Sequence, residues 1–292
     1  MQASLTPWQG RLASYARLMR LDKPIGIYLL LWPTVWGLVA AGVGRPDLLL
    51  TIVFVLGVFF MRSAGCVVND LVDRDIDPQV ARTKERPIAN AEVSPGEALW
   101  LFLGLLALAA PLLLFLNWPT RWLSLGAVFL AVTYPFTKRV THLPQVYLGA
   151  AFGWAIPMAF MAHQRALPLE TWWLYLVTIL WAVIYDTMYA MVDREDDLQA
   201  GVKSTAILFG AYDRLIIGVL QFTVCLLLFG LARYLDLNPV FDLFLLIGAG
   251  NFVYQQYLIR DRQSEQCFKA FLASHWFGVA IFFGLFLGYQ VG

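Results

Sequence analysis

Charged residues are scarce in this chain. Only 14% of its 292 residues are Asp, Glu, Lys or Arg, whereas 60% are hydrophobic. Soluble domains carry about 25% charged residues, so the composition argues against a water-soluble globular protein. Cysteine and histidine are scarcer still, with three residues of each. They lie far apart and form no CxxC pair, which excludes a disulfide framework and a Cys/His metal site. Any metal must therefore bind through oxygen ligands.

The N-terminal region lacks the features of a secretory signal peptide. Residues 8–23, WQGRLASYARLMRLDK, place apolar side chains between Arg11, Arg17 and Arg20. This pattern is typical of a basic amphipathic helix that lies in a membrane interface. The apolar segment that follows is long enough to span a bilayer and carries no A-x-A cleavage pattern. We therefore expect residues 8–23 to form an interfacial helix.

Long apolar runs fill most of the chain, and no strand-like alternation competes with the helical pattern. A spanning helix needs about 20 predominantly apolar residues. The hydropathy predicts an all-α polytopic membrane protein with nine transmembrane helices, packed as two four-helix halves plus a last helix. A single transmembrane domain is expected over residues 1–292. The nine predicted spans are 25–43, 48–68, 96–116, 121–137, 144–162, 171–191, 213–233, 240–259 and 270–290.

Basic residues are distributed unequally between the two ends of these spans. Sixteen Lys and Arg residues fall on the N-terminal side and in loops after even-numbered spans, and only four fall on the opposite side. Cytoplasmic loops of membrane proteins are enriched in Lys and Arg. We therefore expect the N-terminus and the loops 69–95, 137–143 and 192–212 to face the cytoplasm.

The segment CVVNDLVDRDID, residues 66–77, brings four carboxylates to the end of the second predicted span. Asp70, Asp73 and Asp77 are spaced by three and four residues, so on a helix they share one face with Asn69. Carboxylates at this spacing repel one another unless a cation lies between them. Mg²⁺ prefers oxygen ligands and is typically bound by one or two carboxylates plus substrate phosphates. The segment therefore predicts a site for Mg²⁺ and a phosphate.

A second acidic segment, YDTMYAMVDREDD, places Asp186, Asp193 and Asp197 at spacings of seven and four residues at the end of the sixth span. Residues 73–77 and 193–197 both read Asp-Arg-x-x-Asp, which predicts two halves that each present an acidic helix end to a shared centre. One such cluster alone is equally well explained as a solvated helix end that pairs with arginines. Two matching clusters on one membrane face favour a functional site.

Many cations accompany these acids, and a bound phosphate would need them as hydrogen-bond donors. The same residues can also serve only to set the membrane topology. Lys138 and Arg139, in the short loop YPFTKRVTHLPQ, are the best placed. Arg62 lies deeper, within the second span, where it either neutralises the acids or binds an anionic substrate. The candidate phosphate-binding cations are Arg74, Arg82, Lys84, Arg86, Lys138, Arg139, Arg194 and Lys203.

These motifs resemble those of the UbiA superfamily of intramembrane aromatic prenyltransferases. NDLVDRDID matches NDxxDxxxD, DREDD matches DxxxD, and the resemblance covers the whole chain, including the nine spans. Three further segments most resemble the members that prenylate 4-hydroxybenzoate in ubiquinone synthesis. They are RLDKPIG at 20–26, YPFTKRVTHLPQVYLGAAFGWAIPMAF at 134–160 and YDTMYAMVDREDDLQAGVKSTAILFG at 185–210.

The resemblance implies transfer of a polyprenyl group from an all-trans polyprenyl diphosphate to 4-hydroxybenzoate, at the ring carbon ortho to the hydroxyl, with release of diphosphate. It also implies Mg²⁺ as the cofactor and a bacterial inner membrane as the location. The expected partners are the two substrates and the lipid bilayer, with no nucleic acid and no obligatory protein partner. The implied ligands of Mg²⁺ and diphosphate are Asn69, Asp70, Asp73, Asp77, Asp186, Asp193 and Asp197.

The resemblance also suggests individual roles. The expected catalytic residues are Asp73, Asp193, Lys138 and Arg139. Three cations are candidates for the acceptor carboxylate, namely Arg20, Arg62 and Arg139. Independently of the resemblance, aromatic side chains such as Tyr134, Tyr185, Tyr189, Phe152 and Trp154 could stabilise an allylic cation by cation–π contact, although any single one more often packs in the core. The expected substrate-binding residues are Asn69, Arg20, Arg62, Arg74, Arg82, Arg86, Arg194, Lys203 and Tyr134.

Two alternatives remain open from the sequence. One keeps the fold and changes the acceptor to a naphthoate, a homogentisate, a tetrapyrrole or a haem. The other is an ion-coupled secondary transporter. Transporters place their ion sites near the bilayer midplane on broken helices, whereas these acids lie at the rim of the membrane beside many cations, an arrangement that suits phosphate chemistry better.

Overall fold

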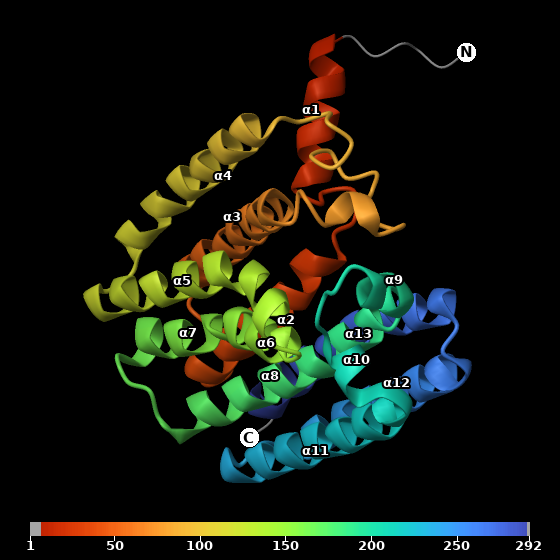
Figure 1. The fold of residues 1–292 in the computed structure, drawn as a ribbon. Helices are drawn as coiled ribbons and strands as arrows, with labels where there is room; N and C mark the ends of the chain where they lie inside the picture. Colours follow the sequence, from red (N-terminus) through yellow and green to blue (C-terminus); the bar gives the residue numbers. More distant parts are fainter. Residues whose placement is uncertain (1–6, 291–292) are drawn as a thin grey trace, which may run out of the picture.

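The computed structural model describes residues 7–290, and within this range every regular element is helical. Most of the helices lie side by side in one bundle, and α1 stands away from it at the N-terminal end (Figure 1). The α-helices are α1 (Pro7–Leu18), α2 (Ile25–Ala41), α3 (Leu48–Val72), α4 (Pro95–Ala109), α5 (Trp118–Val140), α6 (Pro144–Gly153), α7 (Ala155–Gln164), α8 (Leu169–Ala190), α9 (Arg194–Gln199), α10 (Thr205–Phe209), α11 (Asp213–Tyr234), α12 (Val240–Leu258) and α13 (Ser264–Gln290). The 3₁₀ helices are η1 (Asp77–Gln79), η2 (Ala110–Phe115), η3 (Gly210–Tyr212) and η4 (Ile259–Asp261).

Each of the nine predicted apolar segments coincides with one helix or with two consecutive helices. The chain is an all-α polytopic membrane protein, since six of these segments are long and apolar enough to cross a bilayer. A further apolar helix, α2, is shorter, with 17 residues. The six long segments are Leu48–Val72, Pro95–Phe115, Pro144–Gln164, Leu169–Ala190, Thr205–Tyr234 and Ser264–Gln290.

Local sequence signals explain where several helices begin and break. The Asp47 carboxylate accepts from the Leu50 N–H at 2.8 Å and caps α3, and Ser94 and Glu97 form a capping box at α4. Proline has no N–H to continue a helical ladder. Accordingly, Pro111 lies in η2 and Pro157 follows the break between α6 and α7, although α2 continues through Pro33.

Aromatic side chains join the beginning and the end of the chain in the core. Trp36 of α2 packs against Trp181 of α8 at 5.0 Å between ring centroids, and Phe277 of α13 contacts both rings. The Trp36 indole N–H also donates to the Gly278 carbonyl at 3.0 Å, so this buried polar group is satisfied. This packing closes the bundle by holding α13 against α2 and α8.

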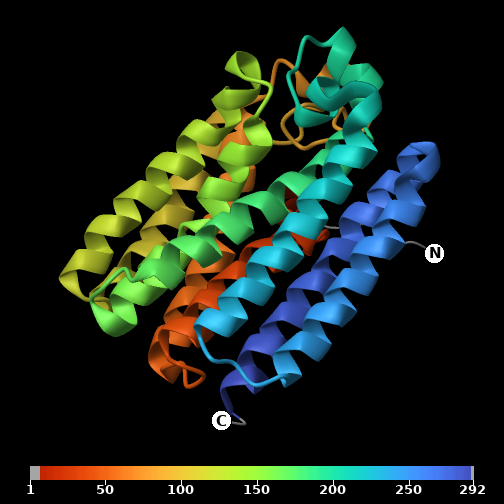
Figure 2. The same ribbon diagram turned by 90° about the horizontal axis from the view of Figure 1, so that it is seen from below.

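The segments that carry the two acidic motifs lie at the same end of the bundle. Figure 2 shows the connection between α3 and α4 beside α9 and α10 at that end. The Ala81 N–H donates to the Asp196 carboxylate at 3.0 Å, which ties the two connections together. The long connections expected as loops at 69–95 and 192–212 therefore contain the short helices η1, α9, α10 and η3.

The acids of each motif do not share one continuous helix face, so that prediction was wrong. α3 ends at Val72, and the Asp73 N–H closes it by donating to the Asn69 carbonyl, whereas Asp77 begins η1. In the second motif α8 ends at Ala190 and Asp193 stands immediately before α9. Each cluster is thus assembled from a helix end and the turn that follows it.

The amphipathic helix predicted for residues 8–23 is shorter, because α1 ends at Leu18 and Arg20 has a left-handed φ of 59°. Leu18 is fully buried in a cluster that contains Val67 of α3 and Ala98 of α4. α1 also exposes apolar residues, among them Trp8 and Leu12. The helix is therefore anchored to α3 and α4 while it keeps an apolar face free.

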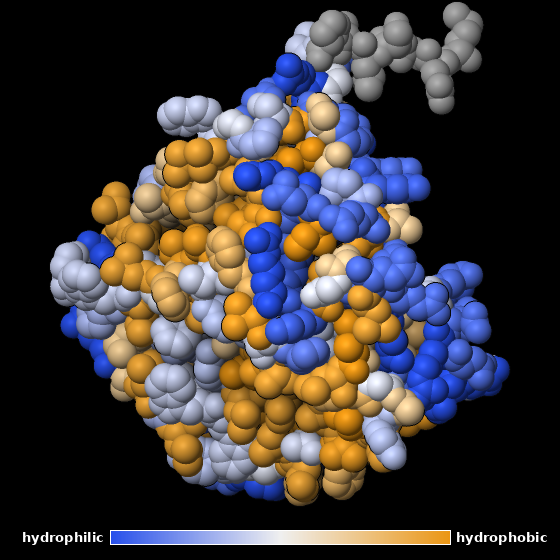
Figure 3. Space-filling model, viewed as in Figure 1, coloured by the Kyte–Doolittle hydropathy of each residue, from blue (hydrophilic) through white to orange (hydrophobic). Residues whose placement is uncertain are grey.

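The outer surface matches the membrane assignment. Figure 3 shows hydrophobic side chains over most of the bundle, while hydrophilic ones gather at the end that carries α1 and the short helices. A membrane protein needs this division because its bundle faces hydrocarbon and its loops face water.

A close backbone contact between α6 and α8 gives a stability prediction. A Cβ added at Gly149 of α6 would lie 2.8 Å from the Ile179 Cα and 2.9 Å from the Ile179 carbonyl of α8, and neither backbone atom can give way. Gly149→Ala should therefore destabilise the fold by about 1–3 kcal/mol and lower the Tm in detergent. Gly104→Ala is the control, since nothing lies within 4 Å of the added Cβ there. An equal or smaller loss for Gly149→Ala than for Gly104→Ala would refute this account of α6–α8 packing.

Candidate active site

One cavity of about 1430 Å³ reaches from the acidic end into the bundle. Its walls come from α2, α3, α5, α6, α8 and α13 and from the connection that follows α3. The acidic-motif residues that line it are Asn69, Asp70, Asp77, Asp186, Asp193 and Asp197. The two motifs, 120 residues apart in the sequence, thus face the same space.

The carboxylates of the first motif are buried, and cations from other segments neutralise them. Asp70 accepts two hydrogen bonds from Arg20 at 2.7 and 2.8 Å and one from Arg86 at 3.0 Å. Arg86 also bonds Asp77 at 2.9 and 3.0 Å, so one guanidinium serves two acids. Lys138 of α5 pairs with Asp73, which has no exposed surface.

The second motif is held by a cation from the first connection. Arg82 donates to Asp193 at 2.8 and 3.0 Å, donates to the Tyr189 hydroxyl, and stacks over the Tyr189 ring at 4.5 Å. Asp197 lines the cavity and interacts electrostatically with Lys138, which pairs with Asp73 of the first motif. Arg82 therefore ties the connection after α3 to the second motif, and Lys138 lies between acids of both motifs.

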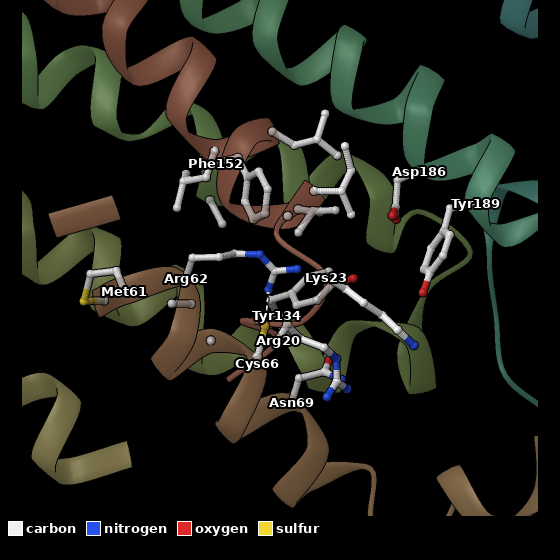
Figure 4. Close-up of a pocket in the computed structure, with 18 of the residues that line it drawn as sticks. Arg20, Lys23, Met61, Arg62, Cys66, Asn69, Tyr134, Phe152, Asp186 and Tyr189 are labelled. Atoms are coloured by element: carbon white, nitrogen blue, oxygen red, sulfur yellow. Dashed lines mark hydrogen bonds between the residues drawn. The ribbon is translucent and has the colours of Figure 1, made fainter. Parts of the chain in front are cut away.

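Arg62 stands apart from these ion pairs, deeper in the cavity. Figure 4 shows its guanidinium near the middle of the space, with Tyr134 behind it and Asp186 and Tyr189 on the far side. Its Nη1 donates to the Cys66 sulfur at 2.8 Å, and its Nε is buried without a hydrogen-bond partner. Among residues 7–290 no carboxylate forms a salt bridge with Arg62, and one of its donors is unused, so the guanidinium is available to an anionic ligand.

Lys23 also lines the cavity, although it was not among the site residues predicted from the sequence. It lies in the turn before α2, and its side chain extends into the space between Arg20 and Tyr189 (Figure 4). The available signal was its position in RLDKPIG, where a cation directly precedes the first apolar span.

Several predicted cations lie elsewhere. Arg74 is exposed and approaches Asp75 at 3.8 Å, and Arg139 is exposed and donates to the Val72 carbonyl at 2.6 Å. Arg194 pairs with Asp213 at the start of α11. None of these three lines the cavity, whereas Arg20, Arg62, Arg82, Arg86, Lys138, Lys203 and Tyr134 do.

The oxygen donors suit Mg²⁺ together with a phosphate rather than Mg²⁺ alone. Among residues 7–290 no three His, Cys, Asp or Glu side chains are grouped closely enough to hold an ion by themselves. However, Asp73 Oδ1 is buried without a hydrogen-bond partner, which leaves one hard oxygen ligand unsatisfied. Mg²⁺ commonly takes only one or two carboxylates and completes its shell with phosphate and water, and this donor set fits that arrangement.

Burial makes these carboxylates weaker acids. Burial raises the pKa of Asp73 and of Asp77, although Lys138 and Arg86 oppose the rise. Burial, reinforced by the neighbouring Asp193, raises the pKa of Asp197 to about 6. Each of these groups therefore costs folding free energy when it is ionised at neutral pH.

This cost gives a prediction for Asp197. The pKa of Asp197 is about 6 in the folded state and about 4 in the unfolded state, so the folded state holds the proton more tightly. The stability that the protonated carboxyl group contributes below pH 4 is therefore lost as the pH rises through 6. Asp197→Asn cannot ionise, and the variant should gain stability over the parent by on the order of 1 kcal/mol at pH 7 and by almost nothing at pH 4. Thermal unfolding at both pH values measures this. A difference that does not grow with pH would contradict it.

Comparisons with known proteins show the family to which this chain belongs. Residues 30–284 match the model of the UbiA prenyltransferase family. The chain is 58% identical over 281 residues to the 4-hydroxybenzoate octaprenyltransferase of Methylococcus capsulatus, and the match covers 96% of each chain. It is 55% identical to the 4-hydroxybenzoate octaprenyltransferase of Nitrosococcus oceani, and that match covers 96% of this chain and 98% of the relative. A UbiA homologue from Aeropyrum pernix has the same fold, with a TM-score of 0.75 and 23% identity, covering 86% of this chain and 96% of the homologue. The homologue from Archaeoglobus fulgidus bound to GPP and Mg²⁺ gives a TM-score of 0.70 at 19% identity, covering 94% and 99%. The chain therefore belongs to the UbiA prenyltransferase family.

Proposed function

We propose that this chain transfers a polyprenyl group from an all-trans polyprenyl diphosphate to the ring carbon ortho to the hydroxyl of 4-hydroxybenzoate, in ubiquinone biosynthesis. Relatives with 53–58% identity over nearly the whole chain carry the name 4-hydroxybenzoate octaprenyltransferase. The structural observation that carries the proposal is a single cavity with acids and cations at one end and apolar walls beyond.

The acidic end suits the diphosphate of the donor. Asn69 and the motif carboxylates would hold Mg²⁺ with the diphosphate oxygens, and the bound ion would supply positive charge that favours departure of diphosphate. Lys23, Arg82, Arg86 and Lys203 line the same region. These cations can donate to phosphate oxygens and spread the negative charge of the leaving group.

The apolar walls suit the prenyl tail. They continue along α3 as far as Val53 and along α5 as far as Ser124. At 1.5 Å per residue, this is roughly 20–25 Å of helix beyond the acids. A long hydrocarbon chain is insoluble in water, so a cavity that lies within the membrane is a suitable place to bind it.

The reaction breaks the bond between the allylic carbon and the diphosphate oxygen and forms a carbon–carbon bond to the aromatic ring. The electron pair of the broken bond leaves with diphosphate, and the ring loses one proton. The developing allylic cation must be protected from water. Tyr134, Phe152, Tyr185 and Tyr189 line the cavity and offer ring faces to it.

Among the three candidates for the acceptor carboxylate, the geometry favours Arg62. Arg20 is engaged by Asp70 through two hydrogen bonds, and Arg139 is exposed and outside the cavity. Arg62 lines the cavity and keeps a free donor at Nε. An acceptor held there would present its ring between the acidic end and the apolar walls.

The membrane topology belongs to the same proposal. The nine helical segments would cross the bacterial inner membrane nine times as two four-helix halves plus α13, with the N-terminus and the acidic end in the cytoplasm. The excess of basic residues on that side supports the orientation. The polar acceptor and the diphosphate head of the donor would then reach the acidic end from the cytoplasmic side.

The first test is prenylation of labelled 4-hydroxybenzoate by membranes that contain this chain, with a short prenyl diphosphate as donor. Product should form with Mg²⁺ and disappear with EDTA. Asp73→Asn and Asp193→Asn should each lower kcat at least about 100-fold, because loss of electrostatic stabilisation at a leaving group costs about 3 kcal/mol or more. Turnover only with a different aromatic acid would show that the acceptor assignment is wrong and that the prenyl transfer is right. Failure to consume diphosphate with any acceptor would favour the transporter.

The second test addresses Arg62. A hydrogen bond to a charged group contributes about 1.5–3 kcal/mol, so Arg62→Gln should raise the KM for 4-hydroxybenzoate roughly 10- to 100-fold. The KM for the prenyl diphosphate should change little. Arg74→Gln is the control, since Arg74 is exposed and lies outside the cavity. Equal increases in both KM values would refute an acceptor role for Arg62.

A further inference from the structure

The guanidinium of Arg62 is held by three neighbours from three different helices. Gly26 of α2 lies against it, Cys66 of α3 accepts its Nη1 hydrogen bond, and the Phe152 ring of α6 lies 5.6 Å from its central carbon. None of these neighbours carries a negative charge. They fix the position of the guanidinium while its charge remains available to a ligand.

Gly26 is the closest of the three. A Cβ built at this position would lie 2.4 Å from Nη2, 2.5 Å from Nε and 2.8 Å from Cζ of Arg62. Real Cβ atoms essentially never approach another heavy atom closer than 3.0 Å, so any side chain here would displace the guanidinium.

The backbone gives no other reason for glycine at this position. Gly26 is the second residue of α2, and it is not among the glycines of residues 7–290 with a positive φ, which are Gly44, Gly201 and Gly210. In an ordinary helical conformation alanine is favoured over glycine by about 0.5–1 kcal/mol. Glycine at position 26 therefore leaves room for the Arg62 guanidinium.

We propose that Gly26 is a positioning residue that sets the affinity for the acceptor by placing the Arg62 guanidinium. This inference rests on the proposed function, because it takes the acceptor carboxylate as the ligand of Arg62. A methyl group at Gly26 forces the guanidinium off the Phe152 face and away from Cys66. The carboxylate then loses a pre-placed donor, and acceptor binding weakens while the donor site at the acidic end is unchanged.

The experiment compares Gly26→Ala with the parent in steady-state kinetics for both substrates. Gly26→Ala should raise the KM for 4-hydroxybenzoate at least about 10-fold, with the kcat at saturating acceptor and the KM for the prenyl diphosphate within about 3-fold of the parent. Gly250→Ala is the matched control, because Gly250 is an exposed helical glycine of α12 with nothing within 4 Å of the added Cβ. It should leave all three constants unchanged.

A double-mutant cycle separates positioning from general damage. If Gly26 acts through Arg62, adding Gly26→Ala to Arg62→Gln should produce no further rise in the acceptor KM. A multiplied loss in the double variant, or equal rises in both KM values for Gly26→Ala, would overturn the proposal. Cys66→Val removes a different neighbour of the guanidinium and should give the same selective rise, about 3-fold, even if Gly26→Ala fails to fold. An unchanged acceptor KM in Cys66→Val together with a misfolded Gly26→Ala would also overturn it.

The kinetics of Arg62→Gln and Gly26→Ala distinguish the acceptor assignment of Arg62 from the positioning role of Gly26. If Arg62→Gln leaves the acceptor KM unchanged, the acceptor assignment in the proposed function is wrong. If Arg62→Gln raises it and Gly26→Ala does not, only the positioning role of Gly26 is wrong.

Discussion

The site depends on buried carboxylates that must be neutralised. Asp70, Asp73 and Asp77 are all buried, and an isolated buried charge costs several kcal/mol. Each is paired with a cation from a different part of the chain: Arg20 follows α1, Arg86 lies in the connection after α3, and Lys138 lies at the end of α5. Removing one partner of such a buried pair typically costs about 3–5 kcal/mol. The same pairs therefore hold together distant segments and keep the acids ionisable.

These pairs also balance the charge of the acidic end. The carboxylates that would bind Mg²⁺ are occupied by arginine and lysine side chains, so the acidic end carries little net charge. In the proposed function, Asn69 and the motif carboxylates would hold Mg²⁺, and the cations beside them would donate to the diphosphate oxygens, so that each charge would have a partner. Arg82 is an example of such a cation, since it bonds Asp193, stacks on Tyr189 and lines the cavity.

Much of this could be predicted from the sequence, because hydropathy and residue spacing are local signals. All nine apolar segments are helical, and the two acidic motifs line one cavity. The expectation of a shared helix face failed, since helical spacing does not show where a helix ends, and α3 stops at Val72. The sequence also does not show which acid each cation pairs with. Arg194, for example, pairs with Asp213 of α11, which lies on a different element. The role of Gly26 depends on an approach between α2 and α3 that no local pattern encodes.

Arg62 differs from the four cations of the cavity wall that pair with the acidic motifs. Arg20, Arg82, Arg86 and Lys138 each have a carboxylate partner, whereas Arg62 has a thiol, an aromatic face and an unused Nε donor. Leaving a guanidinium without a carboxylate inside a membrane bundle is unfavourable, so a fold selected for stability alone would pair it or replace it. The neighbours that hold it instead leave its charge available. A small anion that enters the cavity supplies the missing partner, and the energy that the fold does not recover from Arg62 becomes binding energy for that anion.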